Sequence, residues 1–176
     1  MTIGSSKAVG LSVELAQAIM DDVRKKIQKP DLQIAYMPVT SQNRFPLLVN
    51  GTYDLECGST TNNATRAKDV CCSTNFFYIG TRLLTKKTYA KNPALLEVVG
   101  DSLQVEPCAC MVRKDDPAFK KLVDDNINRL MKSGEFAKLY TKWFESPIVP
   151  KGVNLALPMS AELKANLPAI SDKPAL

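Results

Sequence analysis

The alternation of helical and extended patterns constrains the fold of this chain more than any other feature. Apolar residues recur at helical spacing over 12–29, and Pro30 ends that pattern. The residues that follow, 32–39, alternate between apolar and polar side chains as a strand does. Further strands are predicted at 55–57, 76–84, 98–99 and 108–112, and further helices at 41–50, 117–132, 135–144 and 160–167. Strands that alternate with helices predict an α/β fold, a three-layer lobe with a mainly parallel sheet.

The composition is that of one globular domain with a bias toward small anions. At 176 residues, the chain is long enough to bury one good core. The net charge is +5, but Lys and Arg are dispersed among Asp and Glu and form no basic stripe of the kind that binds nucleic acid. The sequence contains no histidine, which excludes histidine-based catalysis and histidine metal sites. No run approaches about 18 consecutive apolar residues, so no membrane-spanning helix is predicted.

One stretch, residues 50–87, combines hydroxyl groups with an arginine before a long apolar strand. The hydroxyls belong to Ser59, Thr60 and Thr61, and Arg66 follows them. A guanidinium can pair with a carboxylate through two parallel hydrogen bonds, and neighbouring hydroxyls can satisfy the remaining lone pairs. No catalytic base accompanies these groups, so the pattern indicates capture of an anion. The alternative is structural, because Ser, Thr and Asn are common turn and capping residues and Arg66 could lie on a solvated face.

Several motifs, in the same order, resemble one protein family. The segments GTYDLECGSTTNN, FFYIGTRLLTKK, CMVRKDDPAFKKLVDD and SGEFAKLYTKWF are similar to those of periplasmic solute-binding proteins for polar amino acids, in particular the glutamate/aspartate-binding branch. The resemblance extends over most of residues 7–176. It implies the type II solute-binding fold and a role in an ABC-type amino-acid importer. It also implies a periplasmic location, with the signal peptide absent from this chain.

The resemblance assigns roles to five residues. Ser59, Thr61 and Arg66 match the positions that hold the α-carboxylate and amino group of the ligand in this family. Ser41 and Arg44, in the segment TSQNR, match those that contact the side-chain carboxylate in the acidic-amino-acid branch. Two arginines on separate loops can each pair with one end of a dicarboxylate, so the implied ligands are L-glutamate and L-aspartate. Alternatively, Arg44 could pair with an acid on its own helix face.

The resemblance also implies that parts of the family's fold are absent. Family members have a first strand before the segment KAVG and a second lobe between two connecting strands, and here 88–106 form a shortened connection where that lobe would be inserted. We therefore predict a single α/β lobe over 1–150 and a C-terminal tail with a short helix over 151–176. A lone lobe is expected to bind weakly, because an exposed Arg–carboxylate pair contributes only about 0–1 kcal/mol. Its uncovered face is expected to favour self-association.

Five cysteines are the sharpest departure from the family pattern. Cys57 and Cys110 stand where the acidic-amino-acid branch tolerates cysteine, whereas Cys71, Cys72 and Cys108 replace a small residue and two aromatic ones. We interpret them as buried structural thiols, since free cysteine behaves as a small apolar residue. A disulfide between the 71–72 and 108–110 clusters and a thiolate site for a metal or redox reaction are the alternatives.

Together these observations predict a solute-binding component of an importer and not an enzyme. No candidate base stands out, so no catalytic residue is expected, and neither a cofactor nor a bound metal is predicted. The expected partners are an acidic amino acid, an ABC permease and a second copy of the chain, with no nucleic acid. Two other functions remain open: a truncated or engineered scaffold that binds nothing, and a thiol-based metal or redox protein.

Overall fold

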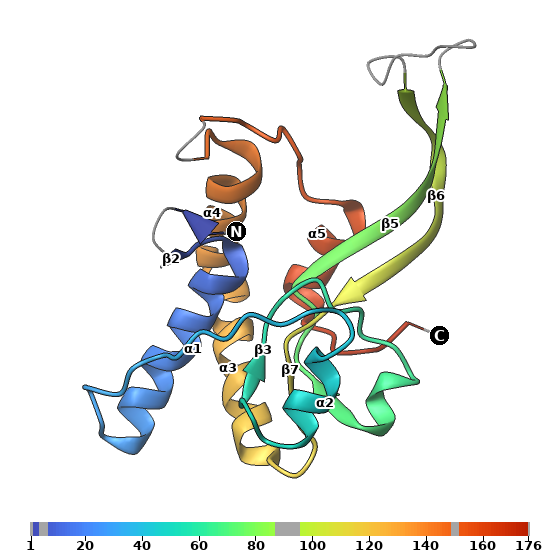
Figure 1. The fold of residues 1–176 in the computed structure, drawn as a ribbon. Helices are drawn as coiled ribbons and strands as arrows, with labels where there is room; N and C mark the ends of the chain where they lie inside the picture. Colours follow the sequence, from blue (N-terminus) through green and yellow to red (C-terminus); the bar gives the residue numbers. More distant parts are fainter. Residues whose placement is uncertain (1, 4–6, 87–95, 149–151, 176) are drawn as a thin grey trace.

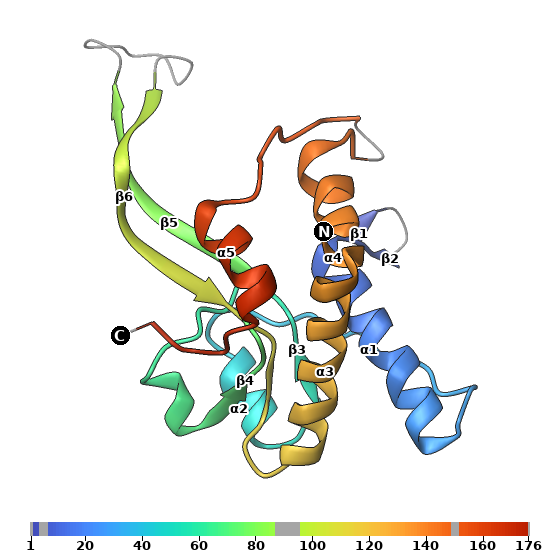
Figure 2. The same cartoon turned by 180° about the vertical axis from the view of Figure 1, so that it is seen from behind.

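The computed structural model describes residues 2–3, 7–86, 96–148 and 152–175. Its helices are α1 (Leu11–Ile27), α2 (Arg44–Val49), α3 (Pro117–Ser133), α4 (Glu135–Tyr140) and α5 (Ala161–Ala169), with a 3-10 turn at Arg66–Lys68 and a π-helical turn at Thr141–Glu145. Its strands are β1 (Thr2–Ile3), β2 (Lys7–Ala8), β3 (Leu55–Glu56), β4 (Val70–Cys72), β5 (Phe77–Lys86), β6 (Leu96–Cys108) and β7 (Met111–Arg113). Figures 1 and 2 show α1 beside α3, the short strands on the other side of α3, and a ribbon of β5 and β6 that leaves the body.

The prediction of a mainly parallel sheet is wrong for the strands that the structure describes. In the three-stranded sheet, β7 lies between β3 and β4 and is antiparallel to both. Strands β5 and β6 form a separate antiparallel pair, and so do β1 and β2. Only nine residues, 87–95, join β5 to β6, whereas a parallel pair needs a crossover of about a dozen residues or more. A single bridge between Asn63 and Ala175 is parallel.

Residues 32–39, which were predicted as a strand, form no strand in the structure. A strand requires a neighbouring backbone that exchanges hydrogen bonds with it, and alternation of side chains alone does not supply one. The segment instead lines one side of a groove of about 720 Å³, with α1 and residues 52–57 on its other sides. The strands predicted at 55–57 and 76–84 are confirmed by β3 and β5, and the one at 108–112 is displaced to β7.

Local signals placed the helices well because helix ends depend on nearby residues. Pro117 begins α3, and the Asp116 carboxylate caps it by accepting a hydrogen bond from the Phe119 amide at 2.8 Å. Gly134 ends α3 in the left-handed conformation, at φ 78°. Ser160 caps α5 by accepting a hydrogen bond from the Leu163 amide at 3.2 Å. Gly10 and Asn43 occupy the cap positions of α1 and α2, and neither makes a side-chain capping hydrogen bond.

The main core lies between α1, α3, α4 and the small sheet. Its buried members include Leu15 and Ile19 from α1, Val123 and Ile127 from α3, and Phe136 from α4. Each side chain of this size stabilises the fold by roughly 1.5–3 kcal/mol when it is fully buried. Within the described residues, no helix is long and apolar enough to cross a membrane.

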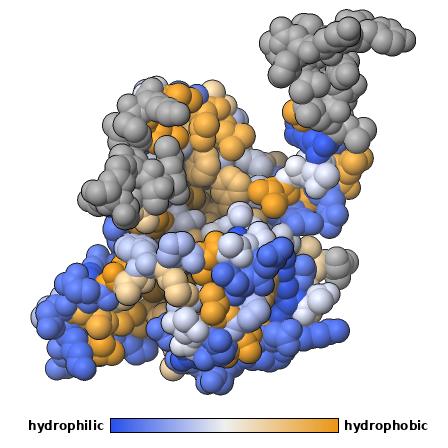
Figure 3. Space-filling model, viewed as in Figure 1, coloured by the Kyte–Doolittle hydropathy of each residue, from blue (hydrophilic) through white to orange (hydrophobic). Residues whose placement is uncertain are grey.

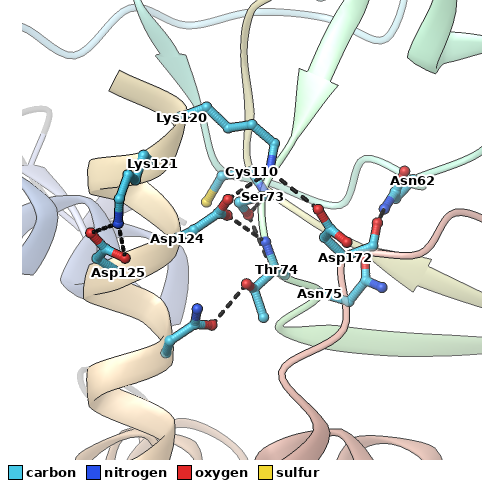
Figure 4. Close-up of polar contacts among 11 residues, drawn as sticks. Asn62, Ser73, Thr74, Asn75, Cys110, Lys120, Lys121, Asp124, Asp125 and Asp172 are labelled. Atoms are coloured by element: carbon cyan, nitrogen blue, oxygen red, sulfur yellow. Dashed lines mark hydrogen bonds and ion pairs between the residues drawn. The ribbon is translucent and has the colours of Figure 1, made fainter. Parts of the chain in front are cut away.

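The C-terminal segment is bound to the body by a buried amide network (Figure 4). Asn62 donates to the side chain of Asn75 at 2.9 Å and to the carbonyl of Asp172 at 2.8 Å. Asn75 donates to the carbonyl of Lys173 at 2.9 Å, and Asn166 of α5 donates to the carbonyl of Asn75 at 2.7 Å. The described part of the predicted tail therefore packs on the same body as the strands, through groups that satisfy one another inside it.

A second link joins the C-terminal segment to α3. The ammonium of Lys120 lies 2.6 Å from the Asp124 carboxylate and 3.2 Å from that of Asp172. Asp124 also accepts a hydrogen bond from the Thr74 amide at 2.8 Å (Figure 4). These contacts hold the loop between β4 and β5 against the helix.

Strands β5 and β6 extend from the body as a two-stranded ribbon (Figures 1 and 2). They pair from Phe77–Cys108 at the base to Lys86–Leu96 at the outer end, with an irregularity between Thr81 and Leu83. Exposed apolar residues gather at the base of the ribbon and over the upper end of the helices (Figure 3). Val98 and Leu103 of the ribbon are 57% and 68% exposed.

Candidate functional site

Arg44, at the start of α2, is a mostly buried cation with three oxygen acceptors. Its Nη1 donates to Thr60 Oγ1 at 2.7 Å and to Glu56 Oε1 at 3.3 Å, and its Nε donates to the Thr40 carbonyl at 3.3 Å. The Tyr53 hydroxyl donates to the Arg44 carbonyl and so fixes the backbone at the same point. The side chain is only 17% exposed. Arg44 thus pairs with an acid on β3 and not with one on its own helix face.

Arg66 lies in the 3-10 turn, and its guanidinium packs over the ring of Phe45, the residue that follows Arg44. Its amide donates to Asn63 Oδ1 at 2.9 Å, which begins the 3-10 turn, and its Nη1 donates to the Thr61 carbonyl at 2.8 Å. The guanidinium carbon lies 4.9 Å from the centre of the Phe45 ring. Because Phe45 follows Arg44 in α2, the structure brings both predicted arginines to one region, each with a different set of contacts.

The predicted hydroxyl groups separate into buried and exposed members. Thr61 Oγ1 donates to Glu106 Oε2 of β6 at 2.7 Å, and Thr60 is buried against Arg44. Ser59 and Ser41 are exposed. Ser59 adjoins Thr60 directly, while Ser41 stands in the turn before α2. Thr61 and Ser59 therefore share the loop that carries Arg66, and Thr60, which was not among the assigned ligand-contacting residues, supplies the contact to Arg44.

Glu56 is the functional candidate that sequence reasoning missed. It is 8% exposed, and its Oε2 has no hydrogen-bond partner among the described residues. Burial raises the pKa of the Glu56 carboxyl, against the opposing effects of the Thr60 hydrogen bond and the charges of Arg44 and Arg66. A Cβ at Gly58 would lie 2.4 Å from Glu56 Oε1, so only glycine leaves room for the carboxylate there. A single acid in a short, otherwise apolar strand was the signal that could have revealed it.

The structure pairs Cys57 with Cys110 in a disulfide, with their Cα atoms 4.2 Å apart. The interpretation of these two residues as thiols is therefore wrong, and the alternative of a bridge between the 71–72 and 108–110 clusters is not formed either. The cause is strand register: Glu56 of β3 lies opposite Met111 of β7, so the next residue along β3 meets the one before Met111.

The other three cysteines, Cys71, Cys72 and Cys108, are free thiols. Cys72 and Cys108 are buried, and burial raises the pKa of each to about 11, so they are structural thiols as interpreted. In the part of the chain that the structure describes, no three His, Cys, Asp or Glu side chains come together as metal ligands would.

Comparison with known proteins shows which family the sequence matches. Residues 1–146 match the bacterial extracellular solute-binding proteins, family 3. A glutamate/aspartate import solute-binding protein of Escherichia coli is 36% identical over 239 positions, which take in 95% of this chain and 79% of the relative. An L-glutamate/L-aspartate-binding protein of Pseudomonas aeruginosa is 35% identical, over 96% of this chain and 80% of its own length. A solved structure, an ancestral arginine-binding protein bound to arginine, agrees with a TM-score of 0.68 at 17% identity, over 82% of this chain and 92% of that one.

The structural likeness shows a periplasmic-binding-protein-like α/β fold, and the site places two arginines among hydroxyl groups, an arrangement suited to an anionic solute. The chain belongs to family 3 of the bacterial extracellular solute-binding proteins. Membership confirms the resemblance inferred from the motifs and agrees with the expectation that the chain is not an enzyme.

The relatives contain internal sequence that this chain lacks. The alignment with the E. coli protein extends over 239 positions, whereas 95% of 176 residues is only about 167 residues. About 70 residues of the relative, inside the aligned span, therefore have no counterpart here.

Proposed function

We propose that this chain is the solute-binding component of an ABC-type importer and that it binds L-glutamate or L-aspartate without covalent change. The observation that carries the proposal is the convergence of Arg44 and Arg66, held by separate turns against Thr60 and Thr61. The relatives at 35–36% identity are glutamate/aspartate-binding proteins, which supports the same ligands. An ABC permease is the partner implied by this role, and the periplasm is the implied location.

In this proposal each arginine holds one end of the amino acid. Arg66, with Ser59 and Thr61, receives the α-carboxylate and amino group, and Arg44, with Ser41, receives the side-chain carboxylate. Arg–carboxylate hydrogen bonds between ionised groups are roughly twice as strong as neutral ones, so these pairs would supply most of the specificity. Glutamate would therefore bind more tightly than glutamine, because Arg44 would meet a charged carboxylate in the first ligand and a neutral amide in the second.

We further propose that binding is weak, because about 70 residues of the relatives are absent. In this proposal, residues 1–150 form a single lobe and 151–176 form a tail. The residues 88–106, inside the lobe, are the shortened connection at which the absent sequence would be inserted. In two-lobed binding proteins, closure of the lobes desolvates the ligand. A ligand held on one side only stays exposed to water, and an exposed ion pair contributes about 0–1 kcal/mol.

Titration calorimetry with L-glutamate, L-aspartate, L-glutamine and L-arginine tests the ligand class. We expect the two acids to bind and the amide and the cation to bind up to about fivefold more weakly, the factor that corresponds to about 1 kcal/mol from an exposed ion pair. Replacing Arg44 by Ala together with Glu56 by Gln should erase the preference for acids without leaving a buried, unpaired charge. Equal affinities for glutamate and glutamine in the parent chain would contradict the assignment of Arg44.

A second candidate function is that of a scaffold that binds no amino acid. The observation that favours it is the missing internal sequence, which leaves a site with contacts from one side. Absence of any heat of binding with all four amino acids at millimolar concentration would support the scaffold against the receptor.

A further inference from the structure

A carboxylate of the protein itself, that of Glu56, already forms an ion pair with Arg44. Glu56 Oε1 accepts a hydrogen bond from Arg44 Nη1 at 3.3 Å, while the same nitrogen donates to Thr60 at 2.7 Å. Within the described residues, Glu56 Oε2 has no partner, although the side chain is more than nine-tenths buried. A buried carboxylate with one oxygen satisfied is a poor counter-ion, because the unpaired oxygen retains its desolvation cost.

Glu56 is also the carboxyl group of this cluster, and burial raises its pKa above the ordinary value. The titratable and charged groups that face it, each from a different element, are Arg44, Tyr53, Arg66, Cys72 and Cys108. Burial raises the pKa of both thiols to about 11 and raises the pKa of the Tyr53 phenol, so these three stay neutral below pH 8. The two guanidinium groups stay charged at every such pH. Among these groups, Glu56 is the acid whose uptake of a proton would remove the charge that pairs with Arg44.

We propose that Glu56 competes internally for Arg44 and that a ligand carboxylate binds at Arg44 together with one proton, which Glu56 takes up from solvent. This inference rests on the proposed function, since it needs a carboxylate to arrive at Arg44. On arrival, two carboxylates share one guanidinium, and each disfavours the ionised form of the other. Glu56, buried and half satisfied, is the one that protonates, while the ligand carboxylate keeps the charge-assisted hydrogen bonds.

The coupling has a definite sign. At high pH the ionised Glu56 holds Arg44 and weakens the binding of an acid, and as pH falls the protonated Glu56 releases Arg44 and binding tightens. One linked proton changes the affinity by at most about tenfold per pH unit. The effect is specific to the second carboxylate, because L-glutamine presents a neutral amide to Arg44. Above about pH 5.5, free L-glutamate remains almost fully ionised, so its own titration adds little.

Calorimetry on the full chain tests the coupling directly. L-Glutamate is titrated at several pH values from 5.5 to 8, in pairs of buffers with different ionisation enthalpies, so that proton uptake is read from the difference in heat. We expect uptake that approaches one proton with L-glutamate and stays near zero with L-glutamine. Glu56→Gln should abolish the uptake, bind L-glutamate more tightly than the parent at pH 8, and show little pH dependence.

The outcomes separate this inference from the proposed function. Binding of L-glutamate by the parent without proton uptake overturns the inference and leaves the proposed function intact, and this measurement needs no variant. Unchanged proton uptake in Glu56→Gln overturns it as well, as does weaker binding by that variant at every pH, which would make Glu56 a residue that only orients Arg44. Absence of binding by the parent with every amino acid overturns both.

Discussion

At the scale of single residues, the two arginines of the site differ in what holds them. Arg44 is engaged by a side-chain carboxylate, Glu56, and a hydroxyl. Arg66 is engaged by the Thr61 backbone carbonyl and the Phe45 ring, neither of which is a charged competitor. The guanidinium of Arg66 is therefore positioned without being neutralised, which suits it for the carboxylate that all amino acids share.

Arg66→Ala is accordingly expected to abolish binding of L-glutamate and L-glutamine alike. Loss of the Thr61 hydrogen bond and the Phe45 contact should also lower the free energy of unfolding by roughly 1–2 kcal/mol. Titration calorimetry and denaturant unfolding measure the two effects. Lys68→Ala removes an exposed cation from the same turn and should change neither. Retained binding in Arg66→Ala would remove this residue from the site.

The three thiols are expected to react at distinct rates. With a pKa of about 11, only about one in a thousand molecules of Cys72 or Cys108 is a thiolate at pH 8, and both side chains are buried. Cys71 is half-buried. In a colorimetric thiol assay at pH 8, we expect one thiol to react at least about tenfold faster than the other two. As a control, three thiols should react in denaturant, and five after the disulfide is also reduced. Fast reaction of three thiols in the native protein would contradict the burial of Cys72 and Cys108.

At the scale of elements, the Cys57–Cys110 disulfide ties β3 to β7 across a sequence separation of 53 residues. Both strands are short, so few backbone hydrogen bonds join them and the disulfide is a large part of their connection. A loop of this length loses chain entropy worth about 4 kcal/mol when it is closed in the unfolded state. Reduction should therefore lower the free energy of unfolding by up to about that amount.

Denaturant unfolding of the oxidised and the reduced protein measures this loss. The reductant should not affect the variant in which Cys57 and Cys110 are both replaced by Ala, and that variant is the control for effects of the reductant itself. Identical midpoints of the oxidised and reduced parent would show that the bridge contributes nothing.

Elements also show how far sequence reasoning extends. The ends of α3 were predictable because Asp116, Pro117 and Gly134 act on their immediate neighbours. The pairing of the strands was not predictable. Leu55 pairs with Val112, and the alternation of side chains in one strand does not indicate which distant segment will pair with it. The site divides in the same way. Motif likeness found Arg44 and Arg66, whereas the role of Glu56 depends on pairing between β3 and a separate helix.

At the scale of the whole molecule, the β5–β6 ribbon projects from the body (Figures 1 and 2). A two-stranded ribbon is marginally stable in water on its own. Beyond its base, where Thr61 and Asn62 pair with Cys108 and Pro107, the outer edges of its described residues have no strand partner and can pair with another chain. Leu103 and Val98 add apolar surface to it. Ribbon and upper helices together present apolar groups on one face (Figure 3). The molecule thus has both an open sheet edge and an uncovered apolar surface, which together promote pairing.

We therefore expect the chain to self-associate at high concentration through the ribbon. Sedimentation velocity from about 10 μM to 1 mM should show a sedimentation coefficient that rises with concentration, because pairing buries apolar side chains and satisfies edge backbone groups. Leu103→Lys places a charge on the apolar surface and should shift the association to higher concentration. Gln104→Lys introduces the same charge at the adjacent exposed position and should shift it less, since no apolar contact is lost. A parent chain that sediments as a monomer throughout would contradict the prediction, and equal effects of the two variants would assign the association to charge instead of to the apolar ribbon.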